Sequence, residues 1–492
     1  MQKISVKTIY LILVISIGLV GLGVGSTFAM FTASSKIDNP ISFTAGIFGE
    51  SDVIETVEVT VPAGETKATN LHVTNSTNSN LNYVMWYIDE GLDIELGSKR
   101  TDSGTYQTTI DAGEEHKYEV SIRNNSSSSV TVVIGVSSGT GSVTLSSDMK
   151  MVPQSELKLK PTLASVITNL YNNSTKTAVP NNSITYQYDT TNNLMKDTAG
   201  NIRYYGASPN NYVYFNCDSY PSTNCELWRI IGVFDGKIKL IRNKTIGLYS
   251  WDNKNKSTGA ETAYGKNDWT TARLMKLLNP STYYTIDAND NGKGQSLYWN
   301  ATSGACYLGQ NNATISCNFT STGIKNDTTR NMIAETTWNL GGWDTSEIFS
   351  NEMYEKERGT TTVSNSSDGI TRATTWTGKI ALPYPSDYGY ATDLSKCSQT
   401  LFNYNSGTDS YACRSNDWMY SIITNSGIND GWLLTPYSGY AYMAFGVHSS
   451  GYVNGYGVYT AFMVAPVLYL GSDQDIVSGD GSQSNPYQLA NS

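Results

Sequence analysis

The chain has 492 residues, a formal net charge of −10 and only 15% charged residues. This charge, together with the lack of any long Lys/Arg run, argues against a nucleic-acid partner, because a net acidic surface repels phosphates. Asn, Ser, Thr, Gly and 34 Tyr dominate the composition, which is typical of exposed, turn-rich β structure. The length leaves space for two or three domains.

Residues 1–30 predict an export signal. Lys3 and Lys7 precede an apolar run over 9–24, and the small residues Thr27 and Ala29 follow it. This order fits a cleavable signal peptide, although the run approaches the ~20 residues that span a bilayer. We therefore expect a signal peptide or membrane anchor, with the bulk of the chain extracellular, at the cell surface. The membrane is an expected partner if the segment stays uncleaved.

The next segment, 31–48, reads FTASSKIDNPISFTAGIF and leads to Glu50 and Asp52. It resembles the exit region of camelysin-like and biofilm-matrix proteins of Gram-positive bacteria, where a Phe-Thr-Ala-Gly turn enters a β-sandwich. The resemblance covers this segment alone and implies a Gram-positive export route. It also motivates an alternative function, that of a structural subunit of a surface fibre or biofilm matrix.

Short β-branched or aromatic segments between Gly, Asn and Ser clusters predict an all-β, Ig-like sandwich over residues 45–151. The expected strands are 57–61, 71–74, 83–88, 118–123 and 130–136. Residues 152–205 contain a predicted helix over 163–171 but are otherwise polar and rich in turns. They are expected to form a polar spacer without a core of its own.

Residues 206–470 predict an α+β domain, followed by a tail strand within 471–492. Segments 227–234 and 237–242 are expected to form a hairpin, because Asp235-Gly236 favours a tight turn. Helices are predicted from Asp268 to Leu278, over 328–340 and over 345–358, each ended by Asn-Pro or Gly. Gly- and Tyr-rich strands close the domain.

The six cysteines fall into three close pairs, which predict three local disulfides in an oxidising compartment. The pairs are Cys217 with Cys225, Cys306 with Cys317, and Cys397 with Cys413. A metal site is disfavoured, because no C-x-x-C occurs and the three histidines lie far from the cysteines. No metal or cofactor is predicted.

The segment 432–470 reads WLLTPYSGYAYMAFGVHSSGYVNGYGVYTAFMVAPVLYL. It resembles the end of the bacterial C-type-lectin-like fold, found in formylglycine-generating-enzyme-like domains and in the variable proteins of diversity-generating retroelements. In that pattern Trp-x-x-Thr/Ser precedes a variable, Gly-punctuated loop, and a closing strand carries Val-Arg-Pro-Val. Here Ala465 replaces the arginine, which puts the contacts of that guanidinium in doubt. The resemblance covers 206–470 in outline and is specific over 432–470.

Known chemistries of this fold find little support in the residues. The Glu-Pro-Asn, Gln-Pro-Asp and Trp-Asn-Asp strings of calcium-dependent sugar binding are missing, and the last cysteines are placed as a loop staple. His448 lies near Ser438, Ser449 and Asp430, but no G-x-S-x-G elbow accompanies them. The chain is therefore predicted not to be an enzyme, with an unrecognised extracellular enzyme as an alternative.

What remains is the surface chemistry around a run of tyrosines. Tyr offers a large amphipathic contact area with few rotatable bonds, and Ser, Gly and Asn add adaptable hydrogen bonding, as in antibody paratopes. The sequence thus predicts an extracellular protein that binds a protein or glycan through this face. The predicted ligand-binding residues are Trp432, Tyr437, Tyr440, Tyr442, His448, Tyr452, Asn454, Tyr456 and Tyr459.

Two other interpretations of this stretch stay open. Tyr and Gly could build a twisted hairpin whose rings pack inward. Residues 437–462 could also be diversified by a retroelement, because substitution at adenine-rich codons generates Tyr, Asn, Ser and Gly. Phe445, Val447, Val453 and Val458 are expected in the core under any of these interpretations.

Overall fold

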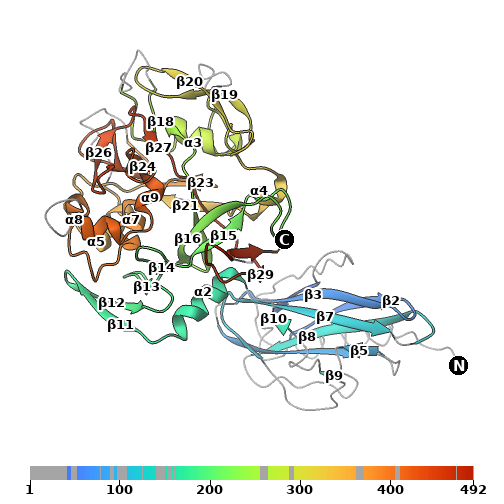
Figure 1. The fold of residues 1–492 in the computed structure, drawn as a ribbon. Helices are drawn as coiled ribbons and strands as arrows, with labels where there is room; N and C mark the ends of the chain where they lie inside the picture. The colour runs from blue at the N-terminus through green and yellow to red at the C-terminus, as the bar shows by residue number, and fades with distance from the viewer. Residues whose placement is uncertain are drawn as a thin grey trace, which may run out of the picture. The chain divides into compact units, whose positions relative to one another are not determined.

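The computed structural model describes residues 41–45, 53–77, 79–88, 94–96, 108–124, 126–139, 150–151, 158–159, 162–254, 264–286, 293–361, 371–404, 410–472 and 474–490. The chain divides into two compact units, Met1–Pro161 and Thr162–Ser492. Both are rich in β structure (Figure 1). No helix of the described ranges is long and apolar enough to cross a membrane, and the predicted export signal over 1–30 lies outside them.

Unit 1 contains two five-stranded sheets, in the orders β1-β3-β7-β10 with β5 beside β7, and β2-β8-β4-β6 with β9 beside β4. Alternate residues of β8, from Val130 to Val136, are buried in the core that these strands build. The predicted strands are confirmed, with longer bounds than expected. The strands are β1 (Ile41–Ala45), β2 (Val53–Val61), β3 (Thr66–Asn75), β4 (Leu81–Ile88), β5 (Ile94–Leu96), β6 (Thr108–Ile110), β7 (Glu115–Asn124), β8 (Val130–Gly139), β9 (Lys150–Met151) and β10 (Lys158–Leu159).

Unit 1 is internally duplicated, which the sequence analysis missed. The same 49-residue offset relates Ala-Gly-Glu at 63–65 to Ala-Gly-Glu at 112–114, and Asn75 to Asn124. Both asparagines are fully buried and organise equivalent turns. Asn75 donates to the carbonyls of Ser79 and Ile110, and Asn124 donates to those of Ser128 and Val61. Strands β3 and β7, which end in these asparagines, pair antiparallel at the centre of their sheet.

Unit 2 is built on an eleven-stranded, branched sheet in the order β11-β12-β13-β14-β16-β15-β30-β29, with β17, β28 and β23 continuing from β16. Its strands are β11 (Thr177–Asn181), β12 (Ile184–Asp189), β13 (Leu194–Lys196), β14 (Ile202–Tyr204), β15 (Tyr212–Phe215), β16 (Glu226–Phe234), β17 (Lys237–Arg242), β23 (Ile380–Ala381), β28 (Val467–Tyr469), β29 (Ile476–Ser478) and β30 (Tyr487–Leu489). The predicted hairpin, β16 with β17, is confirmed. Gly232 in β16 allows β14 to approach, because a Cβ there would meet the Ile202 carbonyl oxygen at 2.2 Å.

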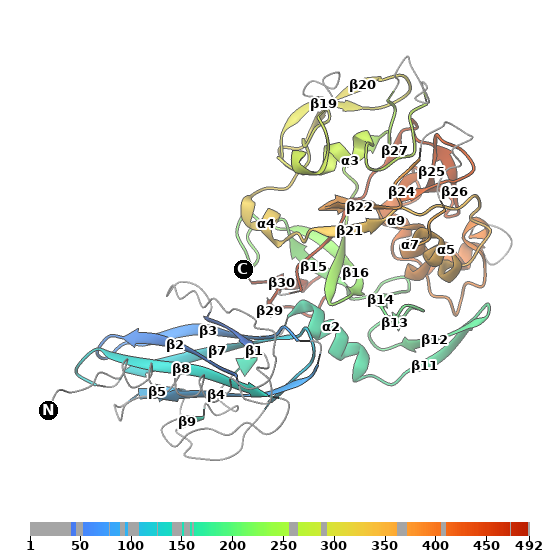
Figure 2. The same ribbon diagram turned by 180° about the vertical axis from the view of Figure 1, so that it is seen from behind.

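A second, five-stranded sheet has the order β18-β27-β24-β25-β26 (Figure 2). Its strands are β18 (Leu248–Tyr249), β24 (Gly431–Pro436), β25 (Met443–Val447), β26 (Val453–Gly457) and β27 (Phe462–Met463). Unit 2 also has two antiparallel two-stranded sheets: β19 (Ser303–Tyr307) with β20 (Thr314–Asn318), and β21 (Thr336–Asn339) with β22 (Thr375–Gly378).

The helices of unit 2 are short. They are α2 (Leu163–Asn172), α3 (Arg273–Leu278), η2 (Ser281–Tyr283), α4 (Asp327–Met332), α5 (Ser350–Glu357), α7 (Pro385–Ala391), η4 (Leu401–Asn403), α8 (Ser410–Ser415) and α9 (Tyr420–Ile423). The predicted helix over 328–340 ends early, because β-branched Thr336 and Thr337 enter β21. Asp268 caps a turn before α3 by accepting from the Thr270 amide at 3.1 Å, so that helix also starts late.

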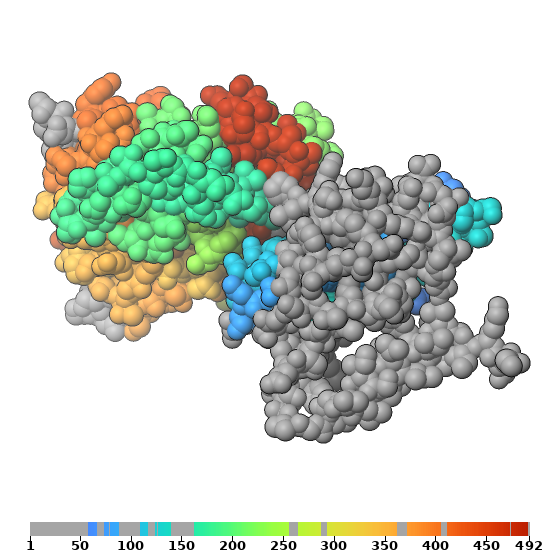
Figure 3. Space-filling view, turned by 90° about the horizontal axis from the view of Figure 1, so that it is seen from below, coloured from blue at the N-terminus to red at the C-terminus, as the bar shows by residue number. Residues whose placement is uncertain are grey.

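Two predicted boundaries differ from the structure. The expected polar spacer, 152–205, supplies α2 and strands β11 to β14, and Leu163, Leu194 and Tyr204 lie in the main core of unit 2. The polar residues that suggested a spacer occupy the turns, as at positive-φ Asn182 and Asn193. The expected tail strand is also part of the sheet, since β30 pairs parallel with β15. Figure 3 shows the last residues of the chain, in red, beside the green residues from the start of unit 2.

All three predicted disulfides are present. The bonded pairs are Cys217–Cys225, Cys306–Cys317 and Cys397–Cys413. Each closes a local loop, and the second joins β19 to β20. Three disulfides fit an oxidising, extracellular environment.

A buried ion network joins the large sheet to α7. Asp387 accepts from Lys239 of β17 at 2.5 Å and from Arg203 of β14 at 2.9 Å, and Arg203 also contacts Asp197 at 2.6 Å. Each of these side chains is at most 1% exposed. Burial alone would raise the pKa of Asp387, but the Lys239 ammonium and the Arg203 guanidinium hold it below its usual value. The carboxylate therefore stays charged and ties two strands to a helix.

Aromatic rings surround the cations of this network. The Lys239 ammonium lies 4.5–5.7 Å from four ring centroids, which is the range of cation–π attraction. These rings belong to Phe234, Trp338, Tyr384 and Tyr469. The rings exclude water from the network, so each buried charge is stabilised by its ion partners and not by solvent.

We predict that Asp387→Ala destabilises unit 2 by about 3–5 kcal/mol, because it leaves two buried cations without their shared carboxylate. Chemical denaturation measures the change. Asp327→Ala is the matched control: this carboxylate is 90% exposed and pairs with Arg330 at 2.7 Å, so its loss should cost less than about 1 kcal/mol. Equal effects of the two substitutions would contradict the structural role given to Asp387.

Asp417 is another buried carboxyl, and it precedes α9. It accepts from the Thr392 hydroxyl at 2.9 Å and from the Met419 amide at 2.8 Å. Burial raises the pKa of Asp417 to about 8, against which these hydrogen bonds act. In the unfolded chain the same carboxyl titrates near its ordinary value. At pH values between these two pKa values, Asp417 keeps its proton in the folded state and releases it in the unfolded state.

The folded state is therefore expected to lose stability from Asp417 as the pH rises from about 4 to 8, because deprotonation favours the unfolded chain in this window. Asp417→Asn, which cannot titrate, should flatten this part of the stability profile. Thermal unfolding of both proteins at pH 5 and pH 8 measures the difference. A variant with the same pH response as the unaltered protein would rule out a protonated Asp417.

Candidate surface site

The β25–β26 hairpin arranges the predicted ligand-binding residues. Its strands are five residues long, so its two ends lie about 15 Å apart. Tyr437, Tyr440, Tyr442 and Tyr459 gather at the open end, whereas His448 and Tyr452 flank the turn at the other. The structure therefore divides the single predicted face into two clusters.

We call the group at the open end the tyrosine patch: Tyr264, Tyr437, Tyr440, Tyr442 and Tyr459. Tyr440 is 51% exposed and Tyr264 is 43% exposed. Ring centroids connect the members in a chain, with spacings of 6.2, 5.9, 5.7 and 5.2 Å in the order 437-440-442-264-459. Tyr264 was not predicted from the sequence, because it lies far from the other four tyrosines along the chain.

Two glycines of the edge strand β26 seat rings of this patch. A Cβ on Gly455 would lie 2.4 Å from the Tyr437 ring, and one on Gly457 would lie 2.5 Å from the Tyr459 ring. Real atoms do not approach so closely, so each ring rests flat on bare backbone. Aromatic cover of this kind also protects glycine in an edge strand. The Gly-x-Gly spacing thus sets where the two tyrosines lie.

The loop that carries Tyr440 and Tyr442 is held from beneath by Asn267. Its side-chain amide donates to the carbonyl oxygens of Tyr437, Tyr440 and Met443 at 2.7–3.1 Å. Arg372 completes the clamp by donating to the Asn267 side-chain oxygen at 2.8 Å and to the Ala441 carbonyl at 3.1 Å. Asn267 and Arg372 are both buried. The exposed rings therefore stand on a fixed backbone.

We call the group at the other end of the hairpin the turn cluster. It consists of His448 and Tyr452 beside the turn and of Phe402 from η4. The His448 ring stacks on Tyr452 at 4.5 Å with an interplanar angle of 20°, and Phe402 meets Tyr452 at 5.9 Å. Three side chains hold the turn itself. Tyr420, Arg414 and Tyr388 donate to the successive carbonyls of residues 449, 450 and 451.

The hydrolase alternative can be compared with this geometry. His448 contacts Ser450 rather than Ser438 or Ser449: its Nδ1 lies 2.6 Å from the Ser450 hydroxyl, and its Nε2 lies 3.9 Å from Asp430 Oδ1. However, Nδ1 also accepts the Ser450 amide at 3.1 Å, and the Gly451 amide donates to the His448 carbonyl. These two amides stabilise the turn and do not point at a place for an oxyanion. The predicted absence of catalysis stays a prediction.

Three predicted site residues have structural contacts: Trp432 is buried, and Asn454 and Tyr456 are half-buried. Trp432 is fully buried and donates to the Tyr249 carbonyl at 2.9 Å, so it cannot contact a ligand. The Tyr456 ring packs on Phe462 at 4.9 Å, and burial raises the pKa of its hydroxyl. The Asn454 side-chain oxygen accepts from the Gly455 amide at 2.8 Å. The inward-packing interpretation therefore holds for Trp432 and Tyr456. Phe445, Val447, Val453 and Val458 are buried, as expected.

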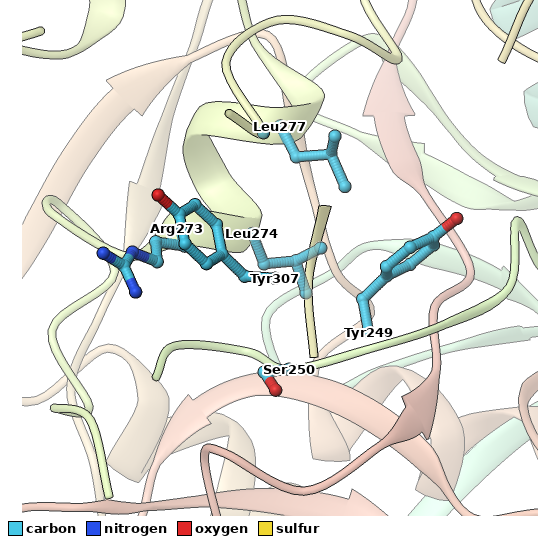
Figure 4. Close-up of a pocket in the computed structure, with 7 residues that line it drawn as sticks. Tyr249, Ser250, Arg273, Leu274, Leu277 and Tyr307 are labelled. Atoms are coloured by element: carbon cyan, nitrogen blue, oxygen red, sulfur yellow. The ribbon is translucent and has the colours of Figure 1, made fainter. Parts of the chain in front are cut away.

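A small pocket lies near the patch and has room for roughly one water molecule. Figure 4 shows its lining residues, which are Tyr249, Ser250, Arg273, Leu274, Leu277, Gly294 and Tyr307. The Arg273 guanidinium packs over the Tyr307 ring at 3.6 Å, and the Ser250 hydroxyl donates to the Tyr459 carbonyl at 2.7 Å. The Ser250 hydroxyl thus holds the backbone of Tyr459, and the pocket itself is too small for an organic ligand.

Within the described ranges, no group of three or more His, Cys, Asp or Glu side chains could hold a metal ion. No family model, no curated protein and no solved structure matches this chain. The resemblances to camelysin-like proteins and to the C-type-lectin-like fold thus remain predictions from the residues quoted above.

We predict that Gly455→Ala displaces the Tyr437 ring and destabilises unit 2 by about 1–3 kcal/mol, as expected for overpacking at a filled position. Thermal unfolding and near-ultraviolet circular dichroism measure the stability and the tyrosine environment. Gly439→Ala is a useful comparison, because Gly439 lies on the exposed loop, where a Cβ would meet the same Tyr437 ring at 2.8 Å and the Asp344 Cβ at 3.8 Å. A larger effect of Gly439→Ala would show that Gly455 does not seat the ring.

Proposed function

We propose that this chain is an extracellular binding protein of a bacterial cell surface, which recognises a protein or glycan and does not catalyse a reaction. The observation that carries the proposal is the tyrosine patch, where exposed rings stand on a backbone clamped by Asn267 and Arg372. Tyrosine loses little conformational entropy on binding, and a fixed backbone reduces that loss further. Such a surface is suited to recognition.

The proposed location and fold rest on the sequence. The export signal over 1–30, as a cleaved peptide or an anchor, would deliver the chain through a Gram-positive route, and the three disulfides agree with an oxidising compartment. We propose an Ig-like sandwich for unit 1, because its two sheets enclose one core. For unit 2 we propose a C-type-lectin-like fold, on the strength of the pattern over 432–470.

The proposal is tested by probing arrays of bacterial and host glycans and surface proteins with the exported protein. We expect a binding partner whose signal falls at least fivefold when Tyr440 and Tyr452, one from each cluster, are both changed to Ala. Tyr411→Ala is the control, since Tyr411 is 68% exposed and belongs to neither cluster. Array signals that are all insensitive to the double substitution would refute the proposed binding face.

A further inference from the structure

We infer that the tyrosine patch binds a neutral oligosaccharide, as a chain of sugar rings lying across Tyr440, Tyr442 and Tyr264. This inference rests on the proposed function and narrows its ligand. It also assigns a role to Tyr264, a residue contributed by a different part of unit 2. Tyr264 joins Tyr459 to the rest of the patch, because its ring lies 5.7 Å from Tyr442 and 5.2 Å from Tyr459.

The exposed area of the tyrosine patch favours a glycan over a protein as its ligand. Three of its rings are 38–51% exposed and the other two are half-buried. With about 250 Å² for a whole aromatic side chain, the patch offers roughly 300–500 Å². A stable protein–protein interface needs about 800 Å² on each partner. A few sugar rings need less and would be covered by a surface of this size.

The chemistry of the patch matches a sugar. Each tyrosine presents an apolar ring face, which packs against the C–H face of a pyranose, and a hydroxyl, which exchanges hydrogen bonds with sugar hydroxyls. Successive rings are tilted by 21–50° rather than coplanar, so they follow a twisted chain and not a flat aromatic ligand.

The charge beside the patch favours a neutral ligand. Asp344 is exposed and, after burial, is the main cause of the raised pKa of Tyr437, so its negative charge reaches the patch. The formal net charge of the whole chain is also negative. An anionic polysaccharide would be repelled, whereas a neutral one carries no such cost.

The inference is tested by calorimetric titration of the whole protein with cellohexaose, mannohexaose and maltohexaose, and with a hexamer of galacturonic acid as the anionic probe. We expect at least one neutral hexasaccharide to bind and the anionic one not to bind. Tyr440→Ala, Tyr442→Ala and Tyr264→Ala should each weaken that binding about fivefold to tenfold. Tyr440→Phe keeps the ring and should retain most of the affinity.

A control and a comparison separate the possible failures. Tyr411→Ala should leave the affinity unchanged, since Tyr411 belongs to neither cluster. Tyr452→Ala should weaken the affinity less than Tyr264→Ala does, because Tyr452 lies in the turn cluster. If no neutral hexasaccharide binds, or if binding depends on Tyr452 and not on Tyr264, the inference is wrong. If the patch tyrosines instead capture a protein on the array, the inference fails while the proposed function stands.

Discussion

The structure of unit 2 depends on the buried carboxylate of Asp387. Lys239 and Arg203 lie on two strands of the large sheet, 148 and 184 residues before Asp387 in the chain. Their common acceptor offsets the burial of both cations, and Asp197 is a second partner of Arg203. Because ion pairs need defined geometry where apolar contacts do not, this network fixes the position of α7 against the large sheet. The neighbouring Glu357 adds to this constraint: burial raises its pKa to about 7, and Ser386 donates to it from α7.

The tyrosine patch also depends on buried polar side chains. Buried polar side chains, Asn267 and Arg372, hold the loop beneath exposed aromatic ones, and the bare backbone of Gly455 and Gly457 receives their rings. The loop therefore gains its shape from hydrogen bonds to its carbonyl groups and not from its own side chains. Tyr440 and Tyr442 contribute exposed rings, while the clamp holds their backbone.

The sequence predicted the local features of this chain well. Hairpin β16–β17 followed from Asp235-Gly236, and the disulfides followed from close cysteine pairs, since both depend on neighbours in the chain. Features set by distant residues were missed. Trp432 was expected at the surface, but it is buried and its indole donates to the carbonyl of Tyr249, a partner 183 residues away in the chain. Polar turns in 177–205 likewise concealed strands whose core partners come later.

The duplication within unit 1 has a consequence for how such a sandwich can be assembled. Each half contributes one strand to the central β3–β7 pair and one to the β4–β8 pair of the opposite sheet. A single half would thus leave both its sheets unfinished, with unpaired backbone along each seam. The two halves of unit 1 therefore complete each other's sheets, and Asn75 and Asn124 hold equivalent turns in them.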